Sequence, residues 1–498
     1  MRIRNYEDLT GHGNKRGRRM AADIIEAGLS AGNPYNNTLK LVSIQDNKLV
    51  FNNRDMEAGG DPRSGPAVFD LDALDRIFIF AVGKGILYMV KALEEVLGDH
   101  LTGGFAIGKH GDEIITRKVE VTFGGHPVPD EFGINGCRRM MDMIKSLNLT
   151  EKDLAITVMG NGCSALAVLP ADGITVSDVK FLNQYGLIDH GMTTEAMSFL
   201  RNQIDCFRGG RVIRAMRPAQ IINLLGIGPG GGARTEPQYA TPYESFLRNN
   251  LWLPNLPDCT TTAEAIDIAE KWGVFDGLPR SIRAKLLSNP KQSDTLSFEE
   301  YESYNCRVFG VMPPNMSALD AAIDKAKSLG FETHIISNYW HVESAPVGGY
   351  VAQLAKYSEK NGAPFKAPCA LFETGELVVT VSGEAGVGGT NQEFCTSAAI
   401  FIDGSKRLVI AAVDTDGTDG PGGDFHPEAT ARGIKCLTGG IVDGYTAAEA
   451  AKKGIDLFTA IKTHGTSTAL WELGSGIAAV QNISVGDLHC ILIMDSDG

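Results

Sequence analysis

Three aspartates are crowded into one short segment, Asp414-Thr-Asp416-Gly-Thr-Asp419, directly after an apolar run that predicts a strand over Arg407–Val413. Carboxylates this close together repel one another unless a divalent cation or another ligand neutralises them. The segment therefore predicts a site for a hard cation held by Asp414, Asp416 and Asp419. A calcium loop of the EF-hand type is a poor reading because the closing glutamate is absent. Asx turns in an exposed loop remain the structural alternative.

A lysine between two glycines, Gly83-Lys84-Gly85, follows the predicted strand Arg76–Val82 and precedes a predicted helix over Ile86–Leu97. The first turn of a helix offers unpaired N–H groups and a partial positive charge, so Lys84 at this place suits a phosphate or a carboxylate. Turn glycines are often only structural, and this reading stays open.

A second glycine-rich turn, Gly160-Asn161-Gly162-Cys163-Ser164, ends the predicted strand Leu154–Met159. Its glycines let the backbone approach a ligand closely, and Ser164 adds a hydroxyl at the expected start of a helix. The spacing matches neither a Walker A loop nor the dinucleotide fingerprint. We expect either an anion cradle or a strand-to-helix turn capped by Ser164.

Two further loops combine glycine with polar residues. Gly124-Gly-His126-Pro-Val-Pro-Asp130 joins a conformationally restricted backbone to an imidazole and a carboxylate, so His126 either binds substrate or orders the loop. The stretch from Gly228 to Arg234 is either a hinge or another phosphate loop, and flexibility is the favoured reading.

Strands and helices alternate along most of the chain, which predicts an α/β fold with two domains, each a mostly parallel sheet flanked by helices. The N-terminal domain is expected to be Rossmann-like and to span residues 1–236. Residues 237–305, where the pattern weakens, are expected to form a connecting segment with some helix. The C-terminal domain is expected to span 306–498, beginning with a strand over Arg307–Val311. Open sheets of this kind bind ligands at the carboxyl ends of their strands.

Composition excludes several classes of function. The 498 residues carry 46 Lys and Arg against 60 Asp and Glu, a net charge of −14, which argues against a general nucleic-acid or anionic-membrane binder. The basic run Lys15–Arg19 is expected to begin a solvated helix. Neither a secretory signal nor a transmembrane stretch is recognisable. The 9 cysteines are scattered without metal-ligand spacing, which favours reduced thiols and a cytoplasmic protein.

Taken together and in this order, the motifs resemble those of type-2 glycerate kinases (glycerate 2-kinases). The resemblance runs from about residue 78 to the end and includes the C-terminal region that the family calls its MOFRL domain. It rests on Gly83-Lys84-Gly85, Gly125-His126-Pro-Val-Pro-Asp130-Glu131, Ser164-Ala-Leu with Gly173-Ile-Thr, Arg201 with Gly209-Gly210-Arg211, Gly388-Gly-Thr-Asn391-Gln392-Glu393-Phe, and Asp416-Gly-Thr-Asp419-Gly420-Pro421.

The resemblance implies a kinase that phosphorylates D-glycerate, or a related small hydroxy acid, with ATP and Mg²⁺ in a cleft between two α/β domains. It implies a small anionic metabolite as partner, with a homodimer left open as the assembly. The implied catalytic residues are Lys84, Glu393 and Asp416, with Glu393 orienting the attacking hydroxyl. The implied ligands of substrate or phosphate are Gly83, His126, Asp130, Gly160, Asn161, Gly162, Ser164, Arg201, Arg211 and Asn391, and those of the metal are Asp414, Asp416 and Asp419.

The chain departs from the family pattern at two cationic positions. Asn202 stands where the family has a lysine, and Thr390 stands where it has an arginine. Losing an arginine removes a bidentate donor to an anion, for which Arg201, Arg211 or Arg234 are the candidates to compensate. The departures keep open a non-kinase enzyme of the same fold, a lyase, hydrolase or isomerase acting on a hydroxy acid or a sugar acid. A binding protein without turnover is disfavoured because the crowded aspartates are retained.

Overall fold

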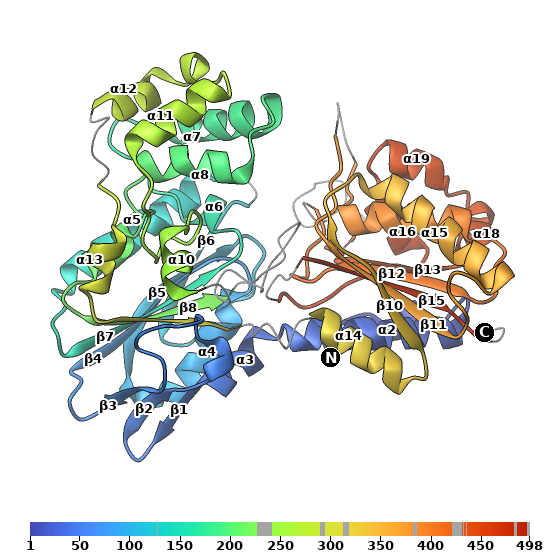
Figure 1. The fold of residues 1–498 in the computed structure, drawn as a ribbon, viewed down its shortest axis with the longest axis horizontal. Helices are drawn as coiled ribbons and strands as arrows, with labels where there is room; N and C mark the ends of the chain where they lie inside the picture. The colour runs from blue at the N-terminus through green and yellow to red at the C-terminus, as the bar shows by residue number, and fades with distance from the viewer. Residues whose placement is uncertain are drawn as a thin grey trace. The chain divides into compact units, whose positions relative to one another are not determined.

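The computed structural model describes the chain except residues 127, 227–241, 289–293, 312–317, 382–385, 421–430, 432, 435, 483–485 and 496–498, and except the side chains of residues 188 and 339 (Figure 1). The described residues form two compact units. The first unit comprises residues 34–226 and 242–311, and the second comprises residues 1–33 and 318–495. No helix within these ranges has the length and apolar character needed to cross a membrane.

The first unit is built on a parallel sheet whose described strands lie in the order β6-β5-β4-β7-β8-β9. Every pairing between neighbours in this list is parallel. The order of strands along the sheet reverses between β4 and β7, as in doubly wound nucleotide-binding folds, so the expected Rossmann-like architecture is confirmed. The strands are β4 (Arg76–Val82), β5 (Leu101–Lys109), β6 (Val119–Gly124), β7 (Asp153–Gly160), β8 (Gln220–Gly226) and β9 (Cys306–Gly310).

Both faces of this sheet are buried, which is why β4 is apolar from Ile77 to Val82. Phe78, Phe80 and Val82 join a core that also contains residues of α5 (Glu131–Ser146). Ile77 and Ile79 join the opposite core, to which α4 (Ile86–Leu97) contributes. The bounds of β4 and α4 agree with those predicted from the sequence.

The first unit also contains a small antiparallel sheet and further helices (Figure 1). Some of these helices pack on one another in a separate apolar core that includes Leu182, Leu200 and Ala265. A small antiparallel sheet contributes Leu49 and Phe51 to the same core as α4. It consists of β1 (Val42–Gln45), β2 (Lys48–Phe51) and β3 (Ala67–Asp70), and follows α3 (Pro34–Leu41). The helices are α6 (Cys163–Leu166), α7 (Val176–Asn183), α8 (Thr194–Gln203), α9 (Arg211–Ala215), α10 (Tyr243–Arg248), α11 (Thr262–Lys271), α12 (Arg280–Ser288) and α13 (Phe298–Glu302).

The expected division at residues 237 and 306 differs from the structure. Residues 242–305 are part of the first unit, because Tyr243, Phe246 and Leu256 lie in the same apolar core as Phe80. Strand β9, expected to open the C-terminal domain, pairs with β8 at the edge of the first sheet instead. The helices of this segment are short and separated by prolines, so the sequence shows no sustained helical pattern there from which the packing could be predicted.

The second unit contains a mixed sheet with the described order β10-β11-β15-β12-β13-β14. Among these described strands only the β10/β11 pairing is parallel, and the other four pairings are antiparallel. The prediction of a mostly parallel C-terminal sheet is therefore wrong. An apolar run predicts a buried strand but not its direction. The strands are β10 (Glu332–Trp340), β11 (Cys369–Gly375), β12 (Leu408–Asp414), β13 (Gly439–Asp443), β14 (Gly476–Ile477) and β15 (Asp487–Ile493).

Helices cover both faces of the second sheet (Figure 1). On one face, Leu408, Ile410 and Ala412 of β12 share a core with α15 and α16. On the other face, Val409 and Ala411 share a core with α2 and α14. The helices of this unit are α1 (Tyr6–Thr10), α2 (Lys15–Ala31), α14 (Ala318–Ser328), α15 (Ser344–Asn361), α16 (Thr390–Phe401), α18 (Thr446–Lys453), α19 (Leu457–Lys462) and α20 (Thr466–Glu472).

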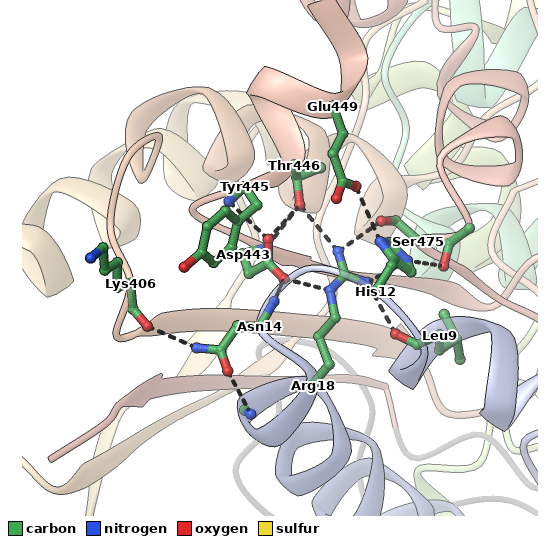
Figure 2. A network of polar contacts seen from close by, with 12 residues as sticks. Leu9, His12, Asn14, Arg18, Lys406, Asp443, Tyr445, Thr446, Glu449 and Ser475 are labelled. Carbon is green, nitrogen blue, oxygen red and sulfur yellow. Dashed lines mark hydrogen bonds and ion pairs between the residues drawn. The ribbon is translucent and has the colours of Figure 1, made fainter. Parts of the chain in front are cut away.

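Residues 1–33 belong to the second unit, whereas the sequence analysis expected them in the N-terminal domain. Helix α2 begins at Lys15 as predicted, but Arg18 is fully buried and not solvated. Its Nε lies 2.5 Å from Asp443 Oδ2, and its Nη2 donates to Thr446 Oγ1 at 3.1 Å (Figure 2). A buried arginine needs such partners, and all of these come from sequence about 430 residues away, which local patterns do not reveal.

Candidate functional site

The two glycine-rich turns predicted separately lie side by side in the first unit. Strands β4 and β7 are neighbours in register, so the turns that follow them meet at the carboxyl edge of the sheet. Lys84 N donates to Asn161 O at 2.8 Å, which joins the turns as a one-residue bridge. This is the point where the strand order reverses, and open α/β sheets bind their ligands there.

Glycine is required for the two turns to come this close. Gly83 has φ +134°, and a Cβ at this position would lie 2.7 Å from Gly160 Cα. A Cβ at Gly160 would in turn lie 2.6 Å from Lys84 O. Any side chain at either position would push the turns apart, so the glycines of the two predicted motifs act together.

His126 joins the same place. Gly162 has φ +78°, and a Cβ there would lie 2.8 Å from His126 Cδ2 and 3.3 Å from Lys84 Cγ. The imidazole and the lysine side chain therefore both approach Gly162. Both side chains are half-buried. The structure thus brings together Lys84, His126 and the Gly160–Ser164 turn, a set of groups suited to an anion.

Asp130 has a structural role in the loop that carries His126. Its Oδ1 accepts from Gly133 N at 2.8 Å, which caps α5, and its Oδ2 lies 2.7 Å from His110 Nε2. Burial raises the pKa of Asp130, but the hydrogen bonds from Gly133 and His110 outweigh it and hold the pKa below its ordinary value. The ionised carboxylate is thus occupied in ordering the loop.

Ser164 and Arg201 line one small cavity beside the Gly160–Ser164 turn, together with Arg208, which the sequence analysis missed. Arg201 Nη2 donates to Asn183 Oδ1 at 2.6 Å. Arg208 Nη1 donates to Cys163 O at 3.2 Å and so holds the Gly160–Ser164 turn in place. The only sequence signal for Arg208 was its place directly before the Gly209-Gly210 pair.

Arg211 is occupied elsewhere. Its Nη1 donates to Asn202 O and to Arg208 O, each at 2.9 Å, and its Nη2 forms an ion pair with Asp294. It does not line the cavity of Ser164 and Arg201. These contacts tie the 202–211 segment to Asp294, and the role of Arg211 as a ligand of substrate or phosphate stays a prediction. Arg234 and the stretch from Gly228 lie outside the described residues.

In the second unit, Asp419 caps helix α16. Its Oδ1 accepts from Asn391 N at 3.1 Å and from Thr390 Oγ1 at 3.1 Å, and its Oδ2 accepts from Gln392 N at 2.9 Å. Burial raises the pKa of Asp419 even though these donors favour the ionised form. Its oxygens serve the helix N-terminus, which leaves them poorly placed to act as metal ligands.

The other two aspartates of the segment form Asx turns. Asp414 Oδ1 accepts from Asp416 N at 3.0 Å, and Asp416 Oδ1 accepts from Thr418 N at 2.7 Å. Within the described ranges, no group of three or more His, Cys, Asp or Glu side chains is arranged to hold a metal ion. A three-aspartate metal site therefore does not fit. Since Mg²⁺ commonly takes one or two carboxylates beside phosphate oxygens, Asp414 and Asp416 are the residues of this segment that would hold such an ion.

Glu393 is paired with a histidine that the sequence analysis did not find. Glu393 Oε1 lies 2.6 Å from His464 Nδ1, and the carboxyl group is buried. Burial raises the pKa of Glu393, and the neighbouring His464 only partly opposes this effect. A carboxylate with a raised pKa beside an imidazole can accept and pass on a proton. Because Glu393 and His464 lie 71 residues apart in the sequence, no local pattern predicted this pair.

Asn391 lies inside the second unit as the link of a buried polar network. Its Nδ2 donates to Asp487 Oδ1 at 2.6 Å, and its Oδ1 lies 3.1 Å from His489 Nε2. His489 Nδ1 in turn lies 3.3 Å from Glu373 Oε2. Burial raises the pKa of Asp487 above its ordinary value, although the interaction with His489 opposes this effect. Asn391 is fully buried, so it positions the start of α16.

The family models, the related sequences and the solved structures that match this chain agree with one another. Residues 20–226 match a domain of unknown function, DUF4147, and residues 369–483 match the MOFRL family. The chain is 30% identical over 424 residues to D-glycerate 2-kinase of Thermotoga maritima, covering 84% of this chain and 91% of that protein. It is 27% identical over 462 residues to glycerate 2-kinase of Pyrococcus horikoshii, covering 91% of this chain and 94% of that protein. A crystal structure of glycerate kinase from Thermotoga maritima superposes with a TM-score of 0.68 at 26% identity, covering 96% of this chain and 99% of that one.

Proposed function

Because the chain belongs to the glycerate 2-kinase family, we propose that it is a kinase that transfers a phosphoryl group from ATP to a hydroxyl of glycerate or a related small hydroxy acid. The relative at 30% identity is matched over 91% of its length, so the resemblance extends across both units. Kinase relatives named for the same substrate support the choice of glycerate as the first acid to test.

The observation that carries this proposal is the convergence of Lys84, His126 and the Gly160–Ser164 turn at the switch point of the first sheet. Phosphoryl transfer depends mainly on positioning and on neutralising the charge of the transferred group. In the proposed reaction the Lys84 ammonium provides that charge, and the turn amides orient the anion. Their fixed place on a rigid sheet edge means that little reorganisation is needed during the reaction.

Asp414 and Asp416 are the residues that would hold Mg²⁺, since Asp419 is occupied as a helix cap. Bound there with ATP, the ion would supply Lewis-acid stabilisation of the phosphate oxygens. The two Asx turns fix the backbone around both aspartates, so the carboxylates are held in place before the nucleotide arrives.

Glu393 and His464 are the proposed acceptor of the hydroxyl proton. The raised pKa of the Glu393 carboxyl makes it a better base than an exposed glutamate, and His464 Nδ1 at 2.6 Å fixes its orientation. Exchanging Glu393 for Gln keeps the shape and removes the base. We expect this variant to lower kcat about 100-fold or more while KM for the acid changes little.

The test is an ATP-consumption assay with D-glycerate and a panel of small hydroxy acids in the presence of Mg²⁺. Lys84→Met is expected to reduce kcat/KM by at least about 100-fold. Lys91→Met is the matched control, because Lys91 lies in the middle of α4, its side chain is 42% exposed and it faces Glu95. If the folded protein consumes no ATP with any hydroxy acid, the kinase proposal is refuted.

A second candidate is a non-kinase enzyme of the same fold, a lyase, hydrolase or isomerase acting on a hydroxy acid or a sugar acid. It is favoured by the two positions where the family's cationic side chains are missing. Asn202 Oδ1 accepts from Arg208 Nε at 3.0 Å, and Thr390 Oγ1 donates to Asp419, so both side chains serve the interior. Titration calorimetry with Mg-ATP discriminates the two. Tight binding supports the kinase, whereas substrate turnover without nucleotide supports the second candidate.

A further inference from the structure

We propose that His489 and Glu373 are positioning residues for the reaction of the proposed function. His489 fixes the side-chain amide of Asn391, and Asn391 fixes the first turn of α16, which carries Glu393. The consequence for catalysis rests on the proposed function, whereas the contacts themselves do not. Neither His489 nor Glu373 belongs to the motifs that indicated the family.

The pair of Glu373 and His489 is polar at a place where packing alone needs apolar side chains. The two residues are partners in the β11/β15 register, and both are fully buried. Two residues away along each strand, Leu371 and Ile491 form the corresponding pair in the apolar core under α16. Replacing a buried ion pair by apolar side chains of similar volume is often neutral or stabilising. The polar pair therefore has a role other than packing.

That role is to hold the side-chain amide of Asn391 in one orientation. Asn391 Nδ2 donates to Asp487 Oδ1 at 2.6 Å and lies 3.4 Å from Asp419 Oδ1. The amide oxygen must then accept, and it lies 3.1 Å from His489 Nε2, so Nε2 carries a proton. A reversed amide would place its oxygen against the carboxyl oxygens of Asp487 and Asp419 and its NH₂ group against the Nε2 proton. His489 thus permits a single orientation of Asn391.

The imidazole of His489 is held at its second nitrogen as well. Its Nδ1 lies 3.3 Å from Glu373 Oε2, and a proton must lie between these two atoms, because a nitrogen lone pair and a carboxylate oxygen repel each other. The hydrogen bond at one imidazole nitrogen fixes the ring and the role of the other nitrogen. Glu373 Oε1 has no hydrogen-bond partner among the described residues, so Oε2 is the oxygen that acts on His489.

The ring of His489 also contacts α16 directly. It stacks on Phe394 with ring centroids 4.3 Å apart and an interplanar angle of 25°. Asn391 and Phe394 lie three residues apart, on one face of the helix, and Glu393 lies between them in the sequence. His489 therefore holds α16 on both sides of Glu393. A displacement of about 1 Å at a reacting group can reduce a rate about 100-fold, so this support matters for a base that must reach a hydroxyl.

Two measurements on the full chain test the proposal. Deuterium exchange of the amides in peptides covering residues 389–394 reports whether the first turn of α16 stays closed. Steady-state kinetics with ATP, Mg²⁺ and D-glycerate give kcat and KM separately. His489→Phe keeps the ring that stacks on Phe394 and removes both nitrogens. We expect it to speed exchange in this turn at least about tenfold and to lower kcat about 10- to 100-fold, while KM for the acid changes less than about twofold.

A conservative variant and a control separate positioning from stability. His489→Gln supplies an amide N–H in place of Nε2–H, and we expect it to recover most of the kcat and most of the exchange protection. Ile491→Ala is the matched control, because Ile491 lies on the same face of β15 in the apolar core. It should lower the Tm, whereas its kcat, measured below the unfolding transition, should stay within about twofold of that of the unchanged protein.

Should His489→Phe fail to fold, Glu373→Gln carries the same test, with a severalfold loss of kcat expected. The proposal is overturned if His489→Phe leaves exchange or kcat unchanged, if His489→Gln performs no better than His489→Phe, or if Ile491→Ala lowers kcat as much. A folded protein that phosphorylates no hydroxy acid refutes the proposed function instead. The exchange measurement then still decides whether His489 holds the first turn of α16.

Discussion

The buried pair of Arg18 and Asp443 gives the most direct test of how residues 1–33 join the second unit. Arg18→Met keeps the length of the side chain and removes the guanidinium. The change leaves Asp443 without its ion-pair partner and takes donors from Thr446 Oγ1, Ser475 Oγ and Leu9 O, which lie 3.1, 3.0 and 3.2 Å away. Removing one partner of a buried pair costs about 3 to 5 kcal/mol.

The lower end of that range is expected. Asp443 keeps the N–H groups of Asn14 and Tyr445, at 2.8 and 2.9 Å, which still stabilise its charge (Figure 2). We therefore expect Arg18→Met to reduce the free energy of unfolding by about 3 kcal/mol. Burial raises the pKa of Asp443, but the Arg18 charge and the hydrogen bonds from Arg18, Asn14 and Tyr445 together hold this pKa below its ordinary value. The difference between variant and parent should therefore be full at neutral pH and shrink as the pH falls through the range where Asp443 becomes protonated.

Urea unfolding followed by circular dichroism and tryptophan fluorescence measures this loss, and Trp340 and Trp471 report on the core of the second unit. Arg16→Met is the matched control on the same helix, because the Arg16 side chain is 48% exposed and lies 3.6 Å from Asp495. It should change stability by no more than about 0.5 kcal/mol. Combining Arg18→Met with Asp443→Asn should recover part of the loss, because no buried charge is then stranded. Equal effects of Arg18→Met and Arg16→Met would refute this reasoning.

Three further predictions concern single residues of the two units. Gly83→Ala should reduce the free energy of unfolding by about 2 kcal/mol or more, because φ is +134° and the new Cβ would lie 2.7 Å from Gly160. Gly65→Ala should reduce it by less, because Gly65 has φ +111° but open space around it. Equal losses of the two variants in urea unfolding would contradict the contact argument. Asp419→Ala should reduce the free energy of unfolding by about 2 kcal/mol because α16 loses its cap, and Asp419→Asn should reduce it by less. Unchanged stability together with an altered dependence of activity on Mg²⁺ would instead identify Asp419 as a metal ligand. Burial raises the pKa of Asp258 from 3.8 to about 6 in the folded chain, so the folded chain holds this proton more tightly than the unfolded chain does. The free energy of unfolding should therefore fall by up to about 3 kcal/mol as the pH rises from 4 to 6. Asp258→Asn should remove that slope in pH-dependent denaturation, and an unchanged slope would exclude Asp258 as its source.

Features with a local cause could be predicted from the sequence. The bounds of β4 and α4 were correct because an apolar run, a glycine turn and a helical pattern follow one another within about 20 residues. The glycines at 83 and 160 were singled out for the same reason. Their adjacency depends on strand order, which no segment of sequence contains.

Features that depend on contacts between residues far apart in the sequence were missed or predicted wrongly. His464 meets Glu393 from another helix end, and Arg208 is recognisable as a site residue only once its burial is known. Strand β15 lies between β11 and β12 and runs against both, which changes the character of the second sheet. Asp419 looked like a metal ligand because its partners, the first N–H groups of α16, lie 27 and 28 residues earlier.

The position of α2 determines the order in which this protein can fold on the ribosome. Its apolar face packs with Val409, Ala411 and Leu488, so its contact surface is complete only after β15 has been synthesised. The parallel sheet of residues 76–310 can close in the meantime, because all of its described strands emerge earlier. During that interval Ile24, Ile25 and Leu29 lack the sheet strands that cover them in the folded chain.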